Sequence, residues 1–567
     1  MKSIQSQSSE FQNFSFDSVS YSNLVDSVNS LTNMYKSFTV RKYHFIYWAL
    51  AGIACLAFGF WVLENEMRRR RVKVFFNVAS FNCYLCSCLL IDQNSYGFHV
   101  VTHHKHGINV DTPVEERKDR ISELLDGVIS LIVSRLHTRD AVRMSVLSRR
   151  WQHVYTFVSE VRFYCFSMST GSLLCKNLEG EKLSELKRKF VQAVDTFLHH
   201  HSGCRITSFD LVCCFRGCIS DSFRRWMNCI GRLGVERLTI RYCSLNRAES
   251  NPHVFSPDIL LGASSVKHIY LMGGSFQISS HKALEDLDFT GVVFTSESVE
   301  CILLNCSNLQ SLKLKFCVLP SKLHIHGPDL QLKTLTLFNC SEVVKIDLSA
   351  RNLTTFELYT LRMVKLMFSN VPSLQNILID IGDRTVASYV FEKVAKDLPN
   401  LKCMYFWTDA SFFEAFEIGG VNNFRHLRQL ALFLDNQNKL DLLALATILD
   451  VCPLLHKLHV SMSQPSTFNG GAEKRLVRHH TQLKEVEFSG FSSTENEYNF
   501  ILYIVENVVS LERLSIFLDV RYYHLNLGRW LRCSCIGNRG DFEMRQRIIR
   551  ERFQGQTISK NVEILIV

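Results

Sequence analysis

The chain is poor in the residues that build flexible or fibrous protein. Its 567 residues include only nine prolines and 26 glycines, which excludes collagen-like stretches and long disordered linkers. Charged residues make up 21%, and the net charge of +10 is modest for this length. No compact stripe of lysine and arginine interleaved with aromatic residues occurs, so we expect no nucleic-acid partner.

Motifs for catalysis are also missing. The sequence has no Gly-x-x-x-x-Gly-Lys-Ser/Thr loop, no Gly-x-Ser-x-Gly elbow and no His-Glu-x-x-His pair, so phosphate-cradling, nucleophile-elbow and zinc-protease sites are excluded in their usual forms. A non-catalytic protein without a cofactor is therefore predicted.

Twenty cysteines are scattered along the chain, and no cleavable signal sequence precedes them. This distribution predicts reduced, mostly buried thiols in the cytoplasm or nucleus. Two groups have metal-ligand residue types, but neither has a second pair at zinc spacing, so no metal site is predicted. They are Cys83, Cys86 and Cys88 with His103, His104 and His106, and His199, His200 and His201 with Cys204.

One long apolar run stands near the N-terminus. Residues 45–63 carry no charge, and the run is long enough to cross a bilayer as a helix. Arg68, Arg69, Arg70, Arg71 and Lys73 follow it, which would place its C-terminal side in the cytosol. The run predicts a candidate membrane-spanning helix between a tail (1–44) and a linker (64–117). The alternative is that the first 117 residues come from an erroneous gene model.

The sequence of residues 118–163 predicts a short helical hairpin that has more apolar surface than it can bury by itself. Val128, Ile129, Ile132 and Leu136 share one face of a helix. Thr138 stands where the next short helix needs an N-cap. About 45 residues cannot bury this surface against themselves, so we expect a partner helix to cover it.

This stretch resembles an F-box. The resemblance rests on Asp119-Arg-Ile-Ser122, Leu124, the apolar run just described, Thr138-Arg-Asp-Ala-Val142 and Ser145-Val-Leu-Ser-Arg-Arg-Trp151. It implies that the hairpin binds a Skp-type adaptor. The contacts, or the residues that support them, would be Leu124, Val128, Ile129, Ile132, Leu136, Val142, Val146 and Trp151. Leu125 and His137 stand where the family usually has proline, and the loss of the stiffness that proline gives a helix start and a turn would weaken the docking geometry.

The chain then becomes periodic. A Leu-x-x-Leu-x-Leu pattern recurs at intervals of 18 to 31 residues, mostly 21 to 28, which is the period of leucine-rich repeats. The last two apolar residues of each unit are two apart and therefore point to one side of a short strand. The units begin at Val235, Val266, Leu284, Leu309, Leu332, Leu353, Leu374, Leu401, Leu427, Leu455, Leu483 and Leu511.

Three units continue into the asparagine-or-cysteine position of the repeat, at Cys243, Cys317 and Cys340, where a small buried side chain meets the turn backbone. The uneven intervals predict an irregular arc, and residues 441–451 and 498–508 have helical spacing. The fold class is thus an α+β or α/β solenoid: a small helical F-box (118–163), a connecting region (164–232), repeats (233–460) and a C-terminal part (461–567).

The C-terminal part resembles the FBD region of plant F-box proteins, through His480-Thr-Gln-Leu483, Asn507-Val-Val-Ser510 and Val562-Glu-Ile-Leu-Ile-Val567. Residues 118–567 are similar overall to the plant F-box/LRR family. The resemblance implies a substrate-recognition subunit of an SCF-type cullin–RING ubiquitin ligase, with the repeats binding a target protein. Residues interleaved with the buried leucines would form the exposed target face: Lys313, Lys315, Thr336, Phe338, Glu357 and Tyr359.

Two alternatives stay open. The repeats could belong to an interaction or ligand-sensing protein that does not engage the ligase, because both family prolines are absent. The chain could also be tethered to a membrane through residues 45–63, with the F-box and the repeats in the cytosol.

Overall fold

The residues that the computed structural model describes all lie in one compact unit, Val100–Val567, and every structural statement below concerns them. They are residues 124–134, 136, 138–145, 149–152, 154–165, 180–201, 205–213, 220–242, 254–255, 263–276, 278, 281–327, 329–382, 387–409, 424–435, 441–464, 480–524, 529–533, 539–554 and 562–567.

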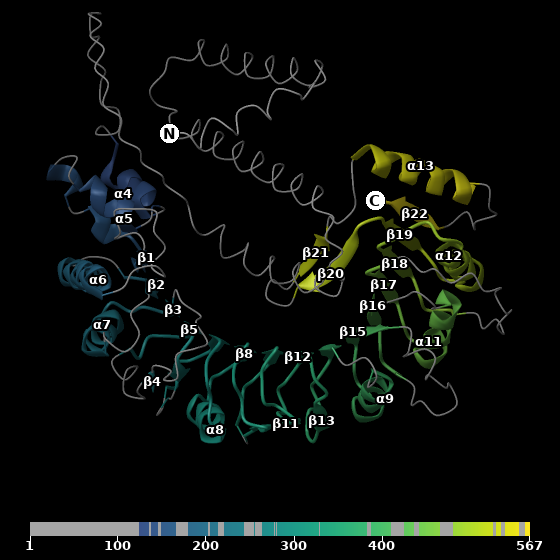
Figure 1. The fold of residues 1–567 in the computed structure, drawn as a ribbon, viewed down its shortest axis with the longest axis horizontal. Helices are drawn as coiled ribbons and strands as arrows, with labels where there is room; N and C mark the ends of the chain where they lie inside the picture. The colour runs from purple at the N-terminus through teal and green to yellow at the C-terminus, as the bar shows by residue number, and fades with distance from the viewer. Residues whose placement is uncertain are drawn as a thin grey trace, which may run out of the picture. The chain divides into compact units, whose positions relative to one another are not determined.

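A fifteen-stranded sheet forms the frame of this unit (Figure 1). All of its neighbouring strands pair in parallel, and they follow one another in chain order. They are β1 (Glu160–Tyr164), β2 (Ser208–Cys213), β3 (Arg237–Tyr242), β5 (His268–Met272), β7 (Asp286–Thr290), β8 (Ser311–Lys315), β10 (Thr334–Phe338), β12 (Thr355–Thr360), β14 (Asn376–Ile381), β15 (Cys403–Asp409), β16 (Gln429–Asp435), β17 (Lys457–Met462), β18 (Glu485–Ser489), β19 (Arg513–Phe517) and β22 (Glu563–Ile566).

The leucine pattern sets the register of these strands. Leu335 of β10 lies beside Leu312 of β8 and Phe356 of β12, and all three are buried. Equivalent residues thus stack from one repeat to the next, because a single repeat has no core of its own and can bury its leucines only against its neighbours. This arrangement confirms the predicted solenoid of parallel strands.

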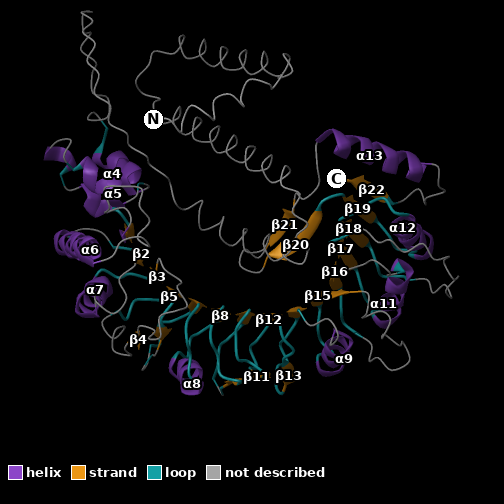
Figure 2. Cartoon of the chain, viewed as in Figure 1, coloured by secondary structure: helices purple, strands orange, loops and turns teal. Residues whose placement is uncertain are grey.

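Helices cover one side of the sheet (Figure 2); the uncovered side is called the inner face below. The helices and 3₁₀ turns are α4 (Asp126–Ser134), α5 (Thr138–Met144), η1 (Arg149–Trp151), η2 (Val154–Phe157), α6 (Gly180–His200), α7 (Ser220–Arg232), α8 (Ser296–Asn305), α9 (Ala387–Asp397), η8 (Leu442–Leu445), α11 (Ala446–Val451), α12 (Glu495–Asn507) and α13 (Arg539–Gln554). The helical segments predicted at 441–451 and 498–508 correspond to η8 with α11 and to α12.

The middle repeats have strands where the repeats with α8, α9 and α12 have helices. A separate parallel sheet, in the order β13-β11-β9, forms from Lys322–His326 (β9), Lys345–Ser349 (β11) and Lys365–Phe368 (β13). The repeats that begin at residues 309, 332 and 353 are among the shorter ones, so an extended return replaces a helix. Two further small sheets pair β4 (Val254–Phe255) with β6 (Ser275–Phe276) and β20 (Val520–His524) with β21 (Arg529–Cys533).

The repeat cysteines close the turns after their strands. The Cys317 thiol donates to the carbonyl of Lys315 at 3.3 Å, and the Cys340 thiol donates to that of Leu314 at 3.2 Å. The residue before each cysteine has a positive φ, 52° at Phe316 and 47° at Asn339, so the turn presents carbonyls that the thiols can reach. The predicted role of these two cysteines is confirmed; Cys243 lies outside the described residues.

Both ends of the main sheet continue beyond the predicted repeats. The connecting region expected at 164–232 contains β2, α6 and α7, and β2 pairs with β1 and β3 in the same sheet. Among the described residues, no helix has both the length and the apolar character needed to span a membrane. The span predicted at 45–63 lies outside the described residues.

Candidate functional site

The hairpin predicted at 118–163 contains α4, α5, η1 and η2. Its inward side is closed by Ile129, Val133, Ala141 and Trp151, each at most 2% exposed. Burial of a large aromatic and three aliphatic side chains gives this small element its stability. Ile129 and Trp151 are therefore placed to support the hairpin from within, which is one of the two roles that the prediction gave them.

The outward side of the hairpin keeps an apolar strip, which consists of Leu125, Val128, Ile132 and Val142. Their side chains are 77%, 42%, 40% and 40% exposed. Leu124 and Leu136 are half-buried against the core, and Val146 lies outside the described residues. Leu125, Val128 and Ile132 follow one another at intervals of three and four, so they form an exposed apolar face that a partner helix can cover.

Helix α4 begins without the family proline. The carbonyl of Leu125 accepts hydrogen bonds from the amides of Val128 and Ile129, at 2.9 and 3.0 Å. These bonds form the first turn that proline would otherwise pre-set. His137 lies outside the described residues, so the second missing proline is not placed.

Thr138 joins the hairpin to the repeats. Its hydroxyl accepts a hydrogen bond from the backbone amide of Arg162 in β1 at 2.7 Å, and the residue is 2% exposed. Among the described strands, β1 is the first of the sheet and pairs only with β2, so this amide points away from the ladder and needs another acceptor. Thr138 is the first residue of α5, as predicted. Its hydroxyl, however, accepts the hydrogen bond from β1 in place of the predicted N-cap bond within α5.

The six residues predicted as a target face do lie together on the inner face. Thr336 pairs in register with Lys313 and Glu357, and Phe338 with Lys315 and Tyr359. The Thr336 hydroxyl donates to Glu357 at 2.7 Å. The rings of Phe338 and Tyr359 stack, with centroids 4.6 Å apart and planes 14° apart.

Three of these six residues are not exposed, contrary to the prediction. Lys315, Thr336 and Phe338 are 8%, 1% and 2% exposed, because each has a partner on the neighbouring strand; Lys315 forms an ion pair with Asp288 at 2.8 Å. Burial is the largest effect on Glu357 and raises the pKa of its carboxyl, against the opposing effect of Thr336. Half-buried Lys313, Glu357 and Tyr359 are the members with remaining surface.

The β20–β21 hairpin packs on the inner face over β15, β16 and β17, and the sequence did not predict it. Trp530 stacks on His459 with centroids 4.2 Å apart, and on Phe433 at 5.6 Å. Tyr523 stacks on Tyr405 at 4.9 Å. These contacts extend the line of inner-face aromatic rings, which includes Trp407 and Phe433, stacked 3.8 Å apart.

His459 is the buried centre of this cluster, with 0% exposure. Its Nδ1 lies 2.9 Å from Glu487 and its Nε2 lies 3.1 Å from the Ser489 hydroxyl. Burial is the main effect that lowers the pKa of His459, so the neutral ring donates from Nδ1 to the carboxylate and accepts from Ser489. A serine hydrolase uses the same order of groups, but Ser489 is also 0% exposed, so the network holds strands together.

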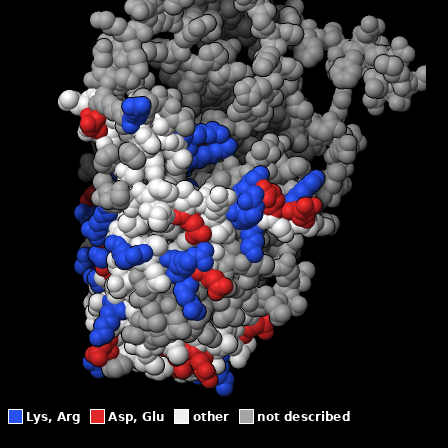
Figure 3. Space-filling model, turned by 90° about the vertical axis from the view of Figure 1, so that its left-hand side faces the viewer, with Lys and Arg blue, Asp and Glu red and all other residues white. Residues whose placement is uncertain are grey.

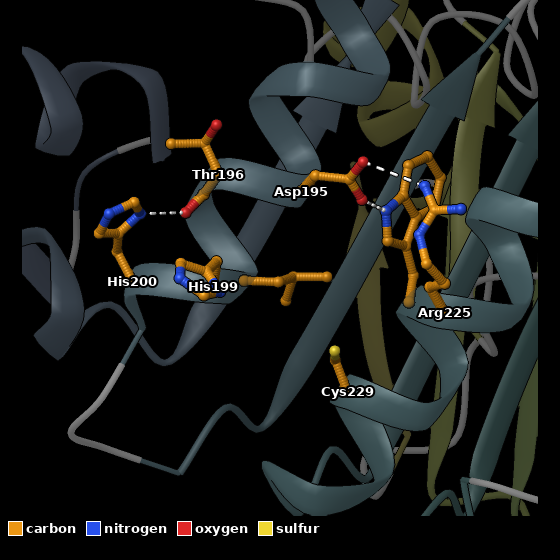
Figure 4. A pocket seen from close by; sticks show the side chains of 8 residues that line it. Asp195, Thr196, His199, His200, Arg225 and Cys229 are labelled. Carbon is orange, nitrogen blue, oxygen red and sulfur yellow. Dashed lines mark hydrogen bonds and ion pairs between the residues drawn. The ribbon is translucent and has the colours of Figure 1, made fainter.

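A cavity of about 410 Å³ lies between α6 and α7 (Figure 4). Asp195 accepts from the Trp226 indole at 2.7 Å and from Arg225 at 3.1 Å. His199 and His200 are exposed at its rim, whereas His201 is buried. No group of metal-ligating side chains occurs among the described residues.

On the side of the molecule in Figure 3, basic and acidic side chains alternate without forming one continuous stripe.

Comparisons with known proteins identify the family. The family model described as the At1g61320/AtMIF1 LRR domain matches residues 197–563. Among curated proteins, the chain is 27% identical to the F-box protein At1g80960 of Arabidopsis thaliana over 41% of this chain and 48% of that protein. It is 26% identical to the F-box/LRR-repeat protein At3g03360 of the same plant, over 42% and 44%.

A third relative, the F-box/FBD/LRR-repeat protein At5g56420 of Arabidopsis thaliana, is 25% identical over 41% of this chain and 51% of that protein. The chain thus spans about half the length of the curated relatives it matches. The resemblance to plant F-box/LRR proteins is confirmed, and no enzyme family appears in these comparisons. The chain belongs to the family of the At1g61320/AtMIF1 leucine-rich-repeat domain.

Proposed function

We propose that this protein is a substrate-recognition subunit of an SCF-type cullin–RING ubiquitin ligase. The observation that carries the proposal is the exposed strip of Leu125, Val128, Ile132 and Val142 on a hairpin whose other side is closed. An apolar strip held on a preformed helix fits the side of a partner helix. The names of relatives that include F-box support a Skp-type adaptor as that partner.

The hairpin is fastened to the repeats in a way that suits this role. Thr138 binds β1, so an adaptor on the hairpin and a target on the repeats would be held at a set separation. A ligase gains rate by keeping the target close to the ubiquitin-charged enzyme, since tethering raises the effective concentration. The repeats would bind the target through the inner face near Lys313, Glu357 and Tyr359, and the β20–β21 hairpin would form one wall of that site.

Adaptor binding by the full chain tests the proposal. The double variant V128E/I132E places two charges on the exposed strip, and we expect it to lower the affinity for a purified Skp-type adaptor at least tenfold, about 1.4 kcal/mol. The matched control L304E/V509E changes two aliphatic residues that are 65% and 74% exposed elsewhere and should bind as the wild type does.

Absence of adaptor binding by the wild-type chain would contradict the proposal. It would favour the alternative of a repeat-based interaction protein that does not engage the ligase. A membrane tether through residues 45–63 remains a separate proposal, tested by whether the expressed protein stays with membranes through carbonate extraction.

A further inference from the structure

Three lysines lie side by side on the outer strands of the middle repeats. Lys345 pairs in register with Lys322 on one side and with Lys365 on the other. Neighbouring strands are about 4.8 Å apart, so three positive side chains start from adjacent positions, where like charges repel.

No acidic side chain among the described residues forms an ion pair with these lysines. The nearest candidate on the same strands, Asp347, is already engaged. It lies 3.8 Å from His324 and accepts a hydrogen bond from the Ser369 hydroxyl at 2.6 Å. Among the described residues, no direct ion pair therefore offsets the repulsion within the lysine row.

Exposed apolar side chains border the lysine row. They lie in the turns that lead into the same strands, and Val344 directly precedes Lys345. The amide of Lys365 donates to the Val344 carbonyl at 2.8 Å, which holds adjacent turns together. The exposed fractions of the four side chains are 38% at Val318, 61% at Val344, 49% at Leu361 and 43% at Met363.

We call Lys322, Lys345 and Lys365 with Val318, Val344, Leu361 and Met363 the basic flank. We propose that the basic flank is a docking surface for an acidic protein segment that also carries apolar side chains. Carboxylates would relieve the repulsion in the lysine row, and apolar side chains would cover the exposed turns. This surface belongs to the β9-β11-β13 sheet and not to the inner face, so it is additional to the target site proposed above.

A protein segment fits the basic flank better than a nucleic acid does. A phosphate backbone would match the lysines but would leave Val344 and Met363 uncovered, and single-stranded nucleic acids are usually held by aromatic stacking, whereas the exposed turn residues here are aliphatic. The pairing of charge with aliphatic surface thus favours glutamate or aspartate alongside leucine-like residues.

The test uses the purified full chain and a short fluorescein-labelled peptide built of Asp-Glu-Leu triplets, with binding measured by fluorescence anisotropy. We expect the wild type to bind this peptide, with affinity that falls as ionic strength rises. The variant K322E/K345E/K365E should lose at least tenfold in affinity, about 1.4 kcal/mol, and V344S/M363S should lose several-fold. Peptides with Asn-Gln-Leu or Asp-Glu-Ser triplets should bind more weakly.

The matched control is K182E/K396E/K402E, which makes the same charge change at three exposed lysines outside the basic flank. Its affinity for the peptide should equal that of the wild type, and thermal melts should show that all variants are folded. Three outcomes would overturn the proposal. They are an equal loss of peptide affinity in both triple variants, no loss in either, and tighter binding of duplex DNA or phosphatidylserine vesicles through the same lysines. None of these measurements involves the adaptor, so their failure would leave the proposed ligase role untouched.

Discussion

Single residues show how the same strand pattern can hide polar groups as well as leucines. On the inner face, Thr336, His459 and Ser489 are almost completely buried, yet each has a hydrogen-bond partner on an adjacent strand. A buried polar group without a partner would cost about 1–3 kcal/mol. The polar residues of the inner face therefore join neighbouring repeats, a role that their alternating positions alone did not indicate.

The His459 network predicts a pH dependence of stability. Because the folded pKa of His459 is lowered, mainly by burial, the unfolded chain takes up a proton that the folded chain does not once the pH falls towards about 6.5. Stability should therefore decrease between about pH 7 and pH 5. The variant H459Q should flatten this decrease in chemical unfolding, whereas H426Q, on an exposed turn, should match the wild type.

The Glu487 carboxylate affects the folding stability in a lower pH range than His459 does. Burial alone would raise the pKa of Glu487, but hydrogen bonds from His459 and Lys457 outweigh it and lower the pKa to about 2. This group stabilises the fold above its unfolded pKa of about 4.3, and that contribution is lost as the pH falls further.

The two pH ranges separate the two residues. If the unfolding free energy changed equally with pH between pH 7 and pH 5 in H459Q and in the wild type, the assignment to His459 would be contradicted.

At the scale of elements, the β20–β21 hairpin depends on the surface beneath it. It pairs with no other strand of the structure's described part, and an isolated two-stranded hairpin is marginal in water. Ring stacking by Trp530 and Tyr523 holds the hairpin on β15, β16 and β17. The Ser461 hydroxyl of β17 also donates a hydrogen bond to the Arg521 carbonyl at 2.6 Å. The hairpin is therefore an element that local opening can release while the repeats stay folded.

Replacing Trp530 by alanine should open this hairpin. The substitution removes the stacking on His459 and Phe433, so we expect cleavage by a protease within residues 520–533 to accelerate about tenfold, which corresponds to about 1.4 kcal/mol of opening free energy. The thermal midpoint of the whole chain should change little. W530F is the control, because it keeps an aromatic ring. An unchanged cleavage rate, or cleavage spread evenly along the repeats, would show that the hairpin is not a separate unit.

At the scale of the whole molecule, each end of the main sheet is covered by another element. Thr138 covers an outward amide of β1. At the opposite end, Gln546 of α13 donates to the Ile566 carbonyl of β22 at 3.2 Å, while Ile549 and Phe553 of α13 are buried in the core. A repeat array needs such caps, because an uncovered terminal strand offers its backbone to another chain.

Removing residues 539–567 should therefore cause self-association. The truncation deletes α13 and β22 and leaves β19 as the last strand. We expect dimers and larger species in size-exclusion chromatography with light scattering, at a concentration where the full chain keeps one mass. I549S, which loosens α13 but keeps β22, should show a weaker effect. A truncated chain with the mass and thermal midpoint of the full chain would contradict the capping role.

Much of the fold could be predicted because its pattern is local. The spacing of Leu309, Leu312 and Leu314 indicates a strand with two inward residues, and repetition of that spacing indicates stacking. The helical spacing of Val128 and Ile132 likewise indicated an apolar strip, and both side chains are exposed. The β20–β21 hairpin could not be predicted, because its position depends on contacts between Trp530 and residues about 70 to 100 positions earlier in the chain.

The amino-acid sequence by itself determined the repeated strand and the helical hairpin, since each follows from residue spacing over short distances, and its motifs carried the resemblance to the family. Only the tertiary structure decided which side chains stay open to a partner. Ile129 and Trp151 turned inward while Val128 and Ile132 stayed exposed, and Thr336 and Phe338 became buried among neighbouring strands. Exposure depends on what residues distant in the chain place against a surface, and local spacing carries no information about those neighbours.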